Sequence, residues 1–360
     1  MEWYQAINSF VRNMCPPSLR KTRRRNLALL TYGIFKKRTL CPSVIVRAFP
    51  LNTTHHHRKK RLQRFEDNKA ISPLTLIPSL VPGVCQLFGL QAKWVPIAID
   101  WTPDKEGEKC FIASIPYKKR ALPLLGWHLK SEDITTSQNE LEEILTRKVI
   151  EALPEKATPV ILADRGFGRA SFLIFLKELE RKLRREIKFV IRLPGNAKVE
   201  WGGKKFRLKD FPLERGKVYW LPGALYREDK VVRVNLVLIW DWGMDEPWYL
   251  ATKLSLPKQA IKWYSKRMHE EEGFRDKKGK LGMKGWKKVK DSSRKDKLLL
   301  GLILTFLFLA FVESKAVPPD FAQQVISWGK ASFIFLVLEW IEQNPKPPPE
   351  LVLLLERGWE

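Results

Sequence analysis

Two short apolar runs that each end in an aspartate constrain the fold of this chain more than any other feature. The first run begins at Trp94 and ends at Asp100, and the second begins at Val160 and ends at Asp164. Continuous apolar runs of this length are typical of strands that are buried on both faces of a sheet. We therefore expect two buried strands, each with a carboxylate at its end.

The patterns on either side of these runs predict an α/β fold. Strand patterns cover residues 94–100, 109–117, 120–129, 158–164 and 187–193, and helical patterns cover residues 140–153 and 169–184. A turn at residues 103–107 joins the first two strands, which indicates an antiparallel meander. Three antiparallel strands, a helix, and then strand, helix and strand form the element order of an RNase H-like core.

The rest of the chain predicts a β-rich insertion and several helical segments. The insertion is rich in Gly, Trp and Pro, and Pro257 after it fits the first turn of a long helix that ends near residue 278. Residues 72–83 contain four helix breakers, whereas residues 298–312 and 320–342 have helical patterns. We expect a helical basic region at 1–90, the first part of the core at 91–194, the insertion at 195–256, completion of the core at 257–318, and a C-terminal helical region at 319–360.

A third acidic segment carries its functional side chains on one face of the long helix. Tyr264, Arg267, Glu271 and Lys278 are separated by 3, 4 and 7 residues, so at about 100° per residue their directions fall within about 60° of one another. An ordinary surface helix with salt bridges between residues i and i+4 is the alternative interpretation.

The three acidic segments together predict a metal site. Carboxylate oxygens are the ligands that Mg²⁺ prefers, and Asp100, Asp164 and Glu271 can form an all-oxygen pocket for two such ions. Two divalent ions are the apparatus for in-line attack on a phosphodiester.

The charge of the chain favours a polyanion as partner. The net charge is +26, residues 1–69 hold 16 Lys and Arg against 3 Asp and Glu, and residues 274–297 hold 11 against 3. Each phosphate that is neutralised releases counterions, which stabilises such a complex. Arg58, Lys59, Lys60 and Arg61 lie in a segment suited to contact DNA phosphates. The alternatives are an ordinary surface helix at this segment and, for the whole chain, a basic solvated surface such as that of a ribosome-associated protein.

The sequence does not indicate secretion, a membrane span or a nucleotide cofactor. The four cysteines are widely spaced, which fits a reducing compartment. The chain does not begin with the pattern of a signal peptide, and residues 298–312 fall short of the ~20 needed to cross a bilayer. Residues 166–168 lack the third glycine of a dinucleotide loop, and no phosphate-binding loop motif occurs. Residues 55–57, three histidines, could bind a metal, but the basic residues after them favour a polar turn that faces DNA.

The spacing of the third segment resembles a known signature. The pattern Y-x2-R-x3-E-x6-K, matched by Tyr264, Arg267, Glu271 and Lys278, resembles that of DDE transposases of the insertion-sequence-4 group. The segments that contain the two aspartates look like the aspartate motifs of this family. Residues 120–127 resemble its third strand, and residues 248–252 the strand before its glutamate helix. The family also carries a β-rich insertion, and the resemblance covers roughly residues 58–315.

The resemblance implies a prokaryotic, cytoplasmic transposase that associates with the nucleoid. Asp100, Asp164 and Glu271 would hold two Mg²⁺ ions, for which Mn²⁺ can substitute. The enzyme would cleave DNA at transposon ends and transfer the strand into target DNA by a cut-and-paste route. Arg267 and Lys278 would bind flanking phosphates.

Tyr264 would hydrogen-bond a phosphate oxygen or position the glutamate helix. The partner implied by the resemblance is double-stranded DNA, as terminal inverted repeats and as target, bound by a homodimer. We expect residues 1–90 to bind the transposon end and the core to fold without them.

One position departs from the family, and two other functions stay open. Some relatives have Trp directly after the signature Arg, where it is thought to stack on a flipped base. This chain has Met268 at that position, and Trp263 or Trp286 could take the stacking role of the missing Trp. The alternatives to a transposase are a catalytically inactive DNA-binding descendant and an RNase H-fold nuclease without strand transfer.

Overall fold

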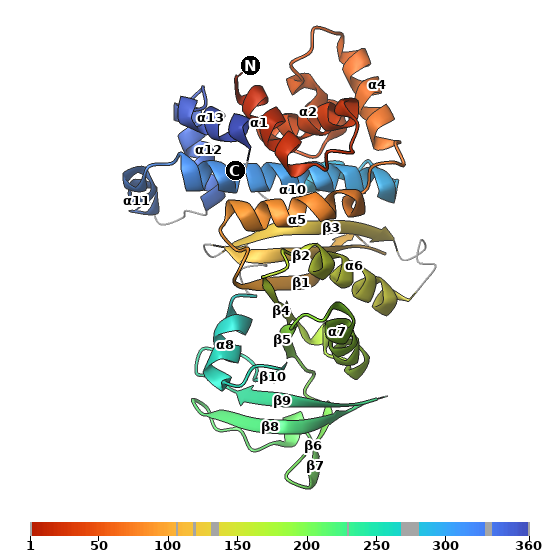
Figure 1. Cartoon of the computed structure of the whole chain (residues 1–360), viewed down its shortest axis with the longest axis vertical. Coiled ribbons are helices and arrows are strands. Elements are labelled where there is room, and N and C mark those ends of the chain that lie inside the picture. Colours follow the sequence, from red (N-terminus) through yellow and green to blue (C-terminus); the bar gives the residue numbers. More distant parts are fainter. Residues whose placement is uncertain are drawn as a thin grey trace.

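A ten-stranded mixed sheet extends through most of the molecule, with helices on both faces and a helical layer at one end (Figure 1). The computed structural model describes residues 2–105, 107–117, 120–130, 137–228, 230–267, 281–327 and 333–358. The strands lie in the order β3-β2-β1-β4-β5-β10-β9-β8-β6-β7.

The first five strands form the RNase H-like core that the sequence predicts. They are β1 Trp94–Lys105, β2 Glu108–Tyr117, β3 Arg120–Lys130, β4 Thr158–Ala163 and β5 Lys188–Arg192. β2 pairs antiparallel with β1 on one side and with β3 on the other, whereas β4 pairs parallel with β1 and β5 pairs parallel with β4. The α/β fold class is therefore confirmed.

The β-rich insertion continues the core sheet. Its strands are β6 Lys198–Trp201, β7 Lys204–Arg207, β8 Val218–Arg227, β9 Val231–Ile239 and β10 Trp248–Thr252. Although β10 is the last of them along the chain, it pairs antiparallel with β5 and so joins the insertion to the core. Backbone hydrogen bonds thus connect the insertion to the strand next to β4.

Three helices cover the central strands. Helices α6 Gln138–Ala152 and α7 Ala170–Leu183 pack against each other, and α8 Pro257–Ser265 packs on β4, β5 and β9. Pro257 begins α8 as expected, but the described helix ends at Ser265, and the next two residues form a turn. Residues 268–280, with Glu271 and Lys278, lie outside the described residues.

The helical layer surrounds α10 Ser292–Lys315. Its other members are α1 Glu2–Met14, α2 Lys21–Lys37, α3 Pro42–Ile45, α4 His55–Glu66, α5 Pro73–Leu87, α11 Pro319–Ser327, α12 Phe333–Gln343 and α13 Pro349–Arg357. One side of α10 packs on β3, and α1, α2, α5 and α12 also contact it (Figure 1).

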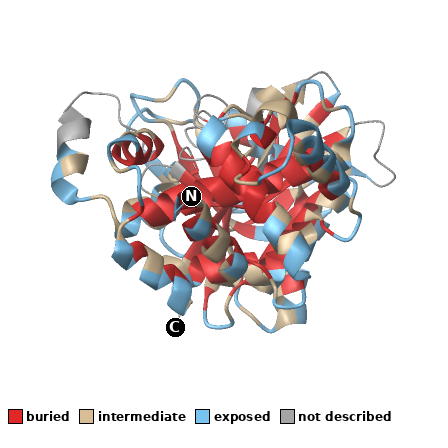
Figure 2. Cartoon of the chain, turned by 90° about the horizontal axis from the view of Figure 1, so that it is seen from above, coloured by how far each residue is buried: buried red, intermediate tan, exposed pale blue. Residues whose placement is uncertain are grey.

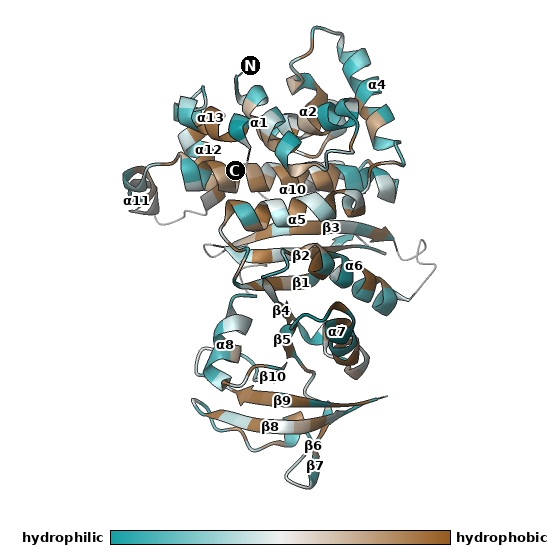
Figure 3. Cartoon of the chain, in the orientation of Figure 1, coloured by the Kyte–Doolittle hydropathy of each residue, from teal (hydrophilic) through white to brown (hydrophobic). Residues whose placement is uncertain are grey.

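Helix α10 is a core helix, as its sequence predicts, although it is longer than expected. The Asp291 side chain accepts a hydrogen bond from the backbone N–H of Arg294 and caps the helix seven residues before the apolar stretch begins. The helix is long and apolar enough to cross a membrane, but 89% of its apolar window is buried inside the protein. Figure 3 shows its hydrophobic residues between the surrounding helices and the sheet, and Figure 2 shows buried residues filling the centre of the molecule.

The four helix breakers at residues 72–83 do not interrupt a helix. They lie in α5, with Pro73 in the first turn, where a missing N–H costs nothing, and with Pro78 and Pro82 inside the helix. The helix buries Leu76, Leu80 and other apolar side chains in the main core. Tertiary packing of this kind can outweigh the low helix propensity of proline.

Candidate active site

Asp100 and Asp164 lie side by side where the parallel pairing of two neighbouring strands ends. β4 ends at Ala163, just before Asp164, but β1, which was expected to end at Asp100, continues to Lys105 as the partner of β2. Ile99 of β1 is in register with Ala163 of β4, so the next residues, Asp100 and Asp164, lie beside each other where the parallel pairing of the two strands ends. The sheet thus brings together two carboxylates that are 64 residues apart in the sequence.

Both carboxylates point to the face of the sheet that α8 covers. Side chains alternate between the two faces of a strand. Ala98 and Leu162, each two residues before an aspartate, belong to the smaller apolar cluster, which also contains Ala260 and Tyr264 of α8. Ile99 faces the larger core on the other side. The alternation therefore places Asp100 and Asp164 on the side of Tyr264.

Tyr264 in the last turn of α8 and Arg267 in the turn after this helix contact these carboxylates. Arg267 Nη1 donates to Asp100 Oδ2 at 3.1 Å, and Arg267 Nη2 lies 3.7 Å from Asp164 Oδ2. The Tyr264 hydroxyl donates to Asp164 Oδ1 at 3.1 Å. The Arg267 side chain is 6% exposed, whereas those of Asp100 and Asp164 are 24% and 31% exposed. The guanidinium therefore bridges both carboxylates from the inner side.

The electrostatics of this cluster keep Tyr264 as a hydrogen-bond donor. Burial raises the pKa of Tyr264, and the negative charge of Asp164 raises it further, although Arg267 acts in the opposite direction. Burial alone would lower the pKa of Arg267, but Tyr264, Asp100 and Asp164 outweigh it, so the pKa of Arg267 is raised. The phenol stays protonated and the guanidinium stays charged at neutral pH.

A buried glutamate, which the sequence analysis missed, connects the segments that carry the two aspartates. Glu142 of α6 is 1% exposed and accepts hydrogen bonds from Trp101 Nε1 and Arg169 Nη1, both at 2.6 Å. Trp101 follows Asp100 directly, and Arg169 ends the loop after Asp164. The sequence does contain a signal for this residue, because Glu142 occupies the same buried stripe of α6 as Leu145 and Val149.

A second acidic cluster lies farther along β1. Ligand atoms of Asp104, Glu108 and His128 lie within 4.8 Å of one another, a spacing that could hold a metal ion. In this structure Lys295 of α10 supplies the positive charge, because its Nζ donates to Asp104 at 2.9 Å and also to Glu108. Trp286 Nε1 donates to Asp104 as well, at 3.0 Å.

The contacts of Trp286 correct one expectation. This side chain is fully buried and hydrogen-bonded to Asp104, so it cannot stack on a DNA base. Trp263 is half-buried, with the Lys266 ammonium 4.1 Å from its ring centre. Met268, the position that departs from the family pattern, lies outside the described residues.

The four basic residues expected to bind DNA lie on α4 and fall into two pairs. Arg58 and Arg61 are half-buried and make internal hydrogen bonds, to the Leu51 carbonyl at 2.5 Å and to Asn26 Oδ1 at 2.8 Å. Lys59 and Lys60 are exposed. The first pair fixes the position of α4, and the second pair is available to a partner.

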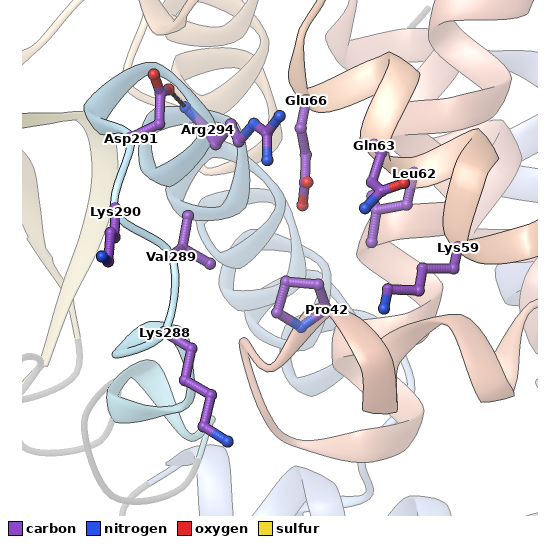
Figure 4. A pocket seen from close by; sticks show the side chains of 10 residues that line it. All are labelled: Pro42, Lys59, Leu62, Gln63, Glu66, Lys288, Val289, Lys290, Asp291 and Arg294. Atoms are coloured by element: carbon purple, nitrogen blue, oxygen red, sulfur yellow. Dashed lines mark hydrogen bonds between the residues drawn. The ribbon is translucent and has the colours of Figure 1, made fainter. Parts of the chain in front are cut away.

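The two basic segments of the sequence meet at one cleft. The cleft, with a volume of about 320 Å³, separates Lys59 on α4 from Lys288, Lys290 and Arg294 near the start of α10 (Figure 4). Glu66 also lines it and is almost fully buried, which raises its pKa to about 7. A carboxyl group with this pKa is only partly ionised at neutral pH, so it offsets less of the surrounding positive charge than an exposed glutamate would.

The fold and the paired aspartates define a class of enzyme that acts on phosphodiester bonds. Within this class, residues 96–307 match the family model described as the transposase DDE domain, and the chain belongs to that family. It is a DDE transposase, and DNA is its substrate. A search of curated proteins found no match.

The described residues fit the divalent metal ions that DDE transposases use. Asp100, within β1, and Asp164, just after β4, offer carboxylate oxygens from neighbouring positions, and both are partly open to solvent. Hard divalent ions prefer such oxygen ligands. The Arg267 guanidinium between them indicates that this pair of carboxylates requires a cation.

Proposed function

We propose that the chain is a prokaryotic transposase of the insertion-sequence-4 group, with the Y-x2-R-x3-E-x6-K signature. It cleaves DNA at transposon ends and transfers the cut strand into target DNA by a cut-and-paste route. The observation that carries this proposal is the position of Tyr264 and Arg267, the first two signature residues, on the paired carboxylates of Asp100 and Asp164.

The catalytic group in this proposal consists of Asp100, Asp164 and Glu271, which bind two Mg²⁺ ions or, in their place, Mn²⁺. Such a pair of ions supplies activation of the attacking oxygen and stabilisation of the leaving oxygen. Tyr264 holds the Asp164 carboxylate by its hydrogen bond. Glu142 keeps the segments after the two aspartates together through Trp101 and Arg169.

The DNA contacts in this proposal lie on two parts of the chain. Arg267 and Lys278 bind phosphates near the reacting bond. Residues 1–90 bind the terminal inverted repeat, with Lys59 and Lys60 on its backbone. The cleft in Figure 4 supports this assignment, because Lys288 and Lys290 line the same cleft as Lys59. The protein acts as a homodimer on DNA, in the cytoplasm.

The test is a cleavage and strand-transfer assay with Mg²⁺ on a supercoiled plasmid that carries the transposon ends. We expect the wild type to nick and join, Asp164→Ala to do neither while keeping its DNA affinity, and Asp320→Asn, at an exposed aspartate of α11, to behave like the wild type. Nicking without joining would identify a nuclease, and binding without nicking would identify an inactive descendant.

A further inference from the structure

We propose that Arg267 is a built-in counter-cation of the active site, which competes with divalent ions for Asp100 and Asp164 and is released when DNA binds. This inference rests on the proposed function of the two carboxylates. It gives Arg267 a role before the reaction, in addition to the phosphate contact proposed above.

The position of Arg267 allows such an exchange. Its guanidinium reaches both carboxylates, at 3.1 and 3.7 Å, from a turn that follows the last residue of α8. The guanidinium can leave by rotation about the side-chain bonds alone, while the backbone hydrogen bond from Arg267 N–H to the Tyr264 carbonyl stays in place. Asp100 and Asp164 are four to five times as exposed as Arg267, so an ion can approach them from the solvent side while the guanidinium still holds the inner side.

Charge balance determines the direction of the exchange. Two carboxylates at one sheet edge repel each other, and Arg267 relieves this repulsion in the metal-free protein. A divalent ion added to the same pair would place three positive charges on two negative ones. We therefore expect Arg267 to weaken metal binding as long as it stays in place.

DNA provides the alternative partner that the displaced guanidinium needs. A mostly buried arginine that loses its carboxylates would be costly unless another anion accepts its hydrogen bonds. A phosphate suits the planar, forked donor set of arginine. Metal binding and DNA binding would then strengthen each other, by the same factor in both directions.

The test is a titration with Mn²⁺, followed by calorimetry, in the absence of DNA. Arg267→Gln should bind Mn²⁺ about tenfold more tightly than the wild type, because hydrogen bonds to charged groups typically change an equilibrium constant on the order of tenfold or more. Arg192→Gln is the matched control, because Arg192 pairs with Glu246, at 2.8 Å, near the same sheet edge. Its Mn²⁺ affinity should stay close to that of the wild type.

A second measurement adds a short duplex DNA. The DNA should tighten Mn²⁺ binding to the wild type and leave that of Arg267→Gln almost unchanged. If Arg267→Gln does not fold, Arg267→Lys keeps the charge without the fork and should give an intermediate Mn²⁺ affinity. Equal or weaker Mn²⁺ binding by the Arg267 variants, or no Mn²⁺ binding by any protein, would overturn the inference.

Failure of this inference can be distinguished from failure of the proposed function. If the wild type nicks and joins plasmid DNA but Arg267→Gln leaves Mn²⁺ affinity unchanged, only the competition by Arg267 is refuted. If Arg267→Gln tightens Mn²⁺ binding but no DNA is cut, the competition stands and the proposed transposition is refuted.

Discussion

Replacing Lys295 by methionine should destabilise the protein strongly, because it removes the cation from a buried acidic cluster. The Lys295 side chain is 0% exposed, and its partners Asp104 and Glu108 are 15% and 5% exposed. Burial alone would raise the pKa of Asp104, but hydrogen bonds from His128, Lys295 and Trp286 hold it well below its usual range. In Lys295→Met, two carboxylates would lose the group that compensates them.

The magnitude of the loss follows from the burial of this cluster. Breaking a buried ion pair by removing one partner costs about 3–5 kcal/mol. Unfolding entropy near 60 °C is about 2.1 cal/mol/K per residue, or roughly 0.76 kcal/mol/K for 360 residues. The melting temperature should therefore fall by about 4–7 °C.

Thermal unfolding, followed by circular dichroism, measures this loss. Lys297→Met is the matched control, because Lys297 is equally buried in α10 but its hydrogen bonds go to Ser293, a neutral residue. Adding Glu108→Gln to Lys295→Met should recover part of the loss, since one uncompensated carboxylate disappears. A melting temperature of Lys295→Met within ~1 °C of the wild type would refute the reasoning, because breaking a buried ion pair costs far more than that.

Three further predictions concern other parts of the molecule. Glu142→Gln should lower the free energy of unfolding by about 1–3 kcal/mol, because Arg169 loses its carboxylate partner. The same variant should nick plasmid DNA more slowly, and an unchanged melting temperature together with unchanged nicking would contradict the role of Glu142. Burial raises the pKa of Asp296 to about 8 from its ordinary 3.8, so the folded state holds this proton more tightly than the unfolded state. The free energy of unfolding should therefore fall as pH rises from about 4 to about 8, by at most about 1.4 kcal/mol per pH unit. Asp296→Asn keeps an oxygen acceptor for the His128 N–H and should flatten this dependence in melts across that range, whereas an unchanged slope would exclude Asp296 as its source. Lys59→Ala and Lys288→Ala should each reduce the slope of log K against log salt for duplex DNA by about 0.9, with little change in melting temperature; a stability loss without a change in slope would indicate a structural role.

The two aspartates of the active site could be predicted from the sequence because the signal is local: each one directly follows a buried apolar run. The end of the first strand could not be predicted in this way, because β1 continues past Asp100 to Lys105 through its pairing with β2. The contacts of Arg267 could not be predicted in this way. Its spacing from Glu271 indicated a helix face, but the structure places it in a turn, next to strands 100 or more residues earlier in the chain.

The features that the sequence did not predict depend on distant contacts. Asp104, Glu108 and His128 meet Lys295 only because α10 packs on β3. The prolines of α5 are tolerated because its apolar side chains are buried by other elements. The core was expected to fold without residues 1–90, but α1, α2 and α5 share one apolar cluster with α10 and the sheet. Their removal would expose α10.

The arrangement of helices around α10 has a consequence during protein synthesis. α1, α2 and α5 leave the ribosome before α10, whereas α12, which also packs on it, leaves afterwards. For a short time the nascent chain contains all of the apolar helix α10 before α12 has been synthesised and can pack on it. A stop codon or frameshift before residue 333 would make that state permanent, and exposed apolar surface of this kind is prone to aggregation and degradation. Late truncations of the gene should therefore lower the amount of protein in the cell, even though they leave Asp100, Asp164 and Glu271 intact.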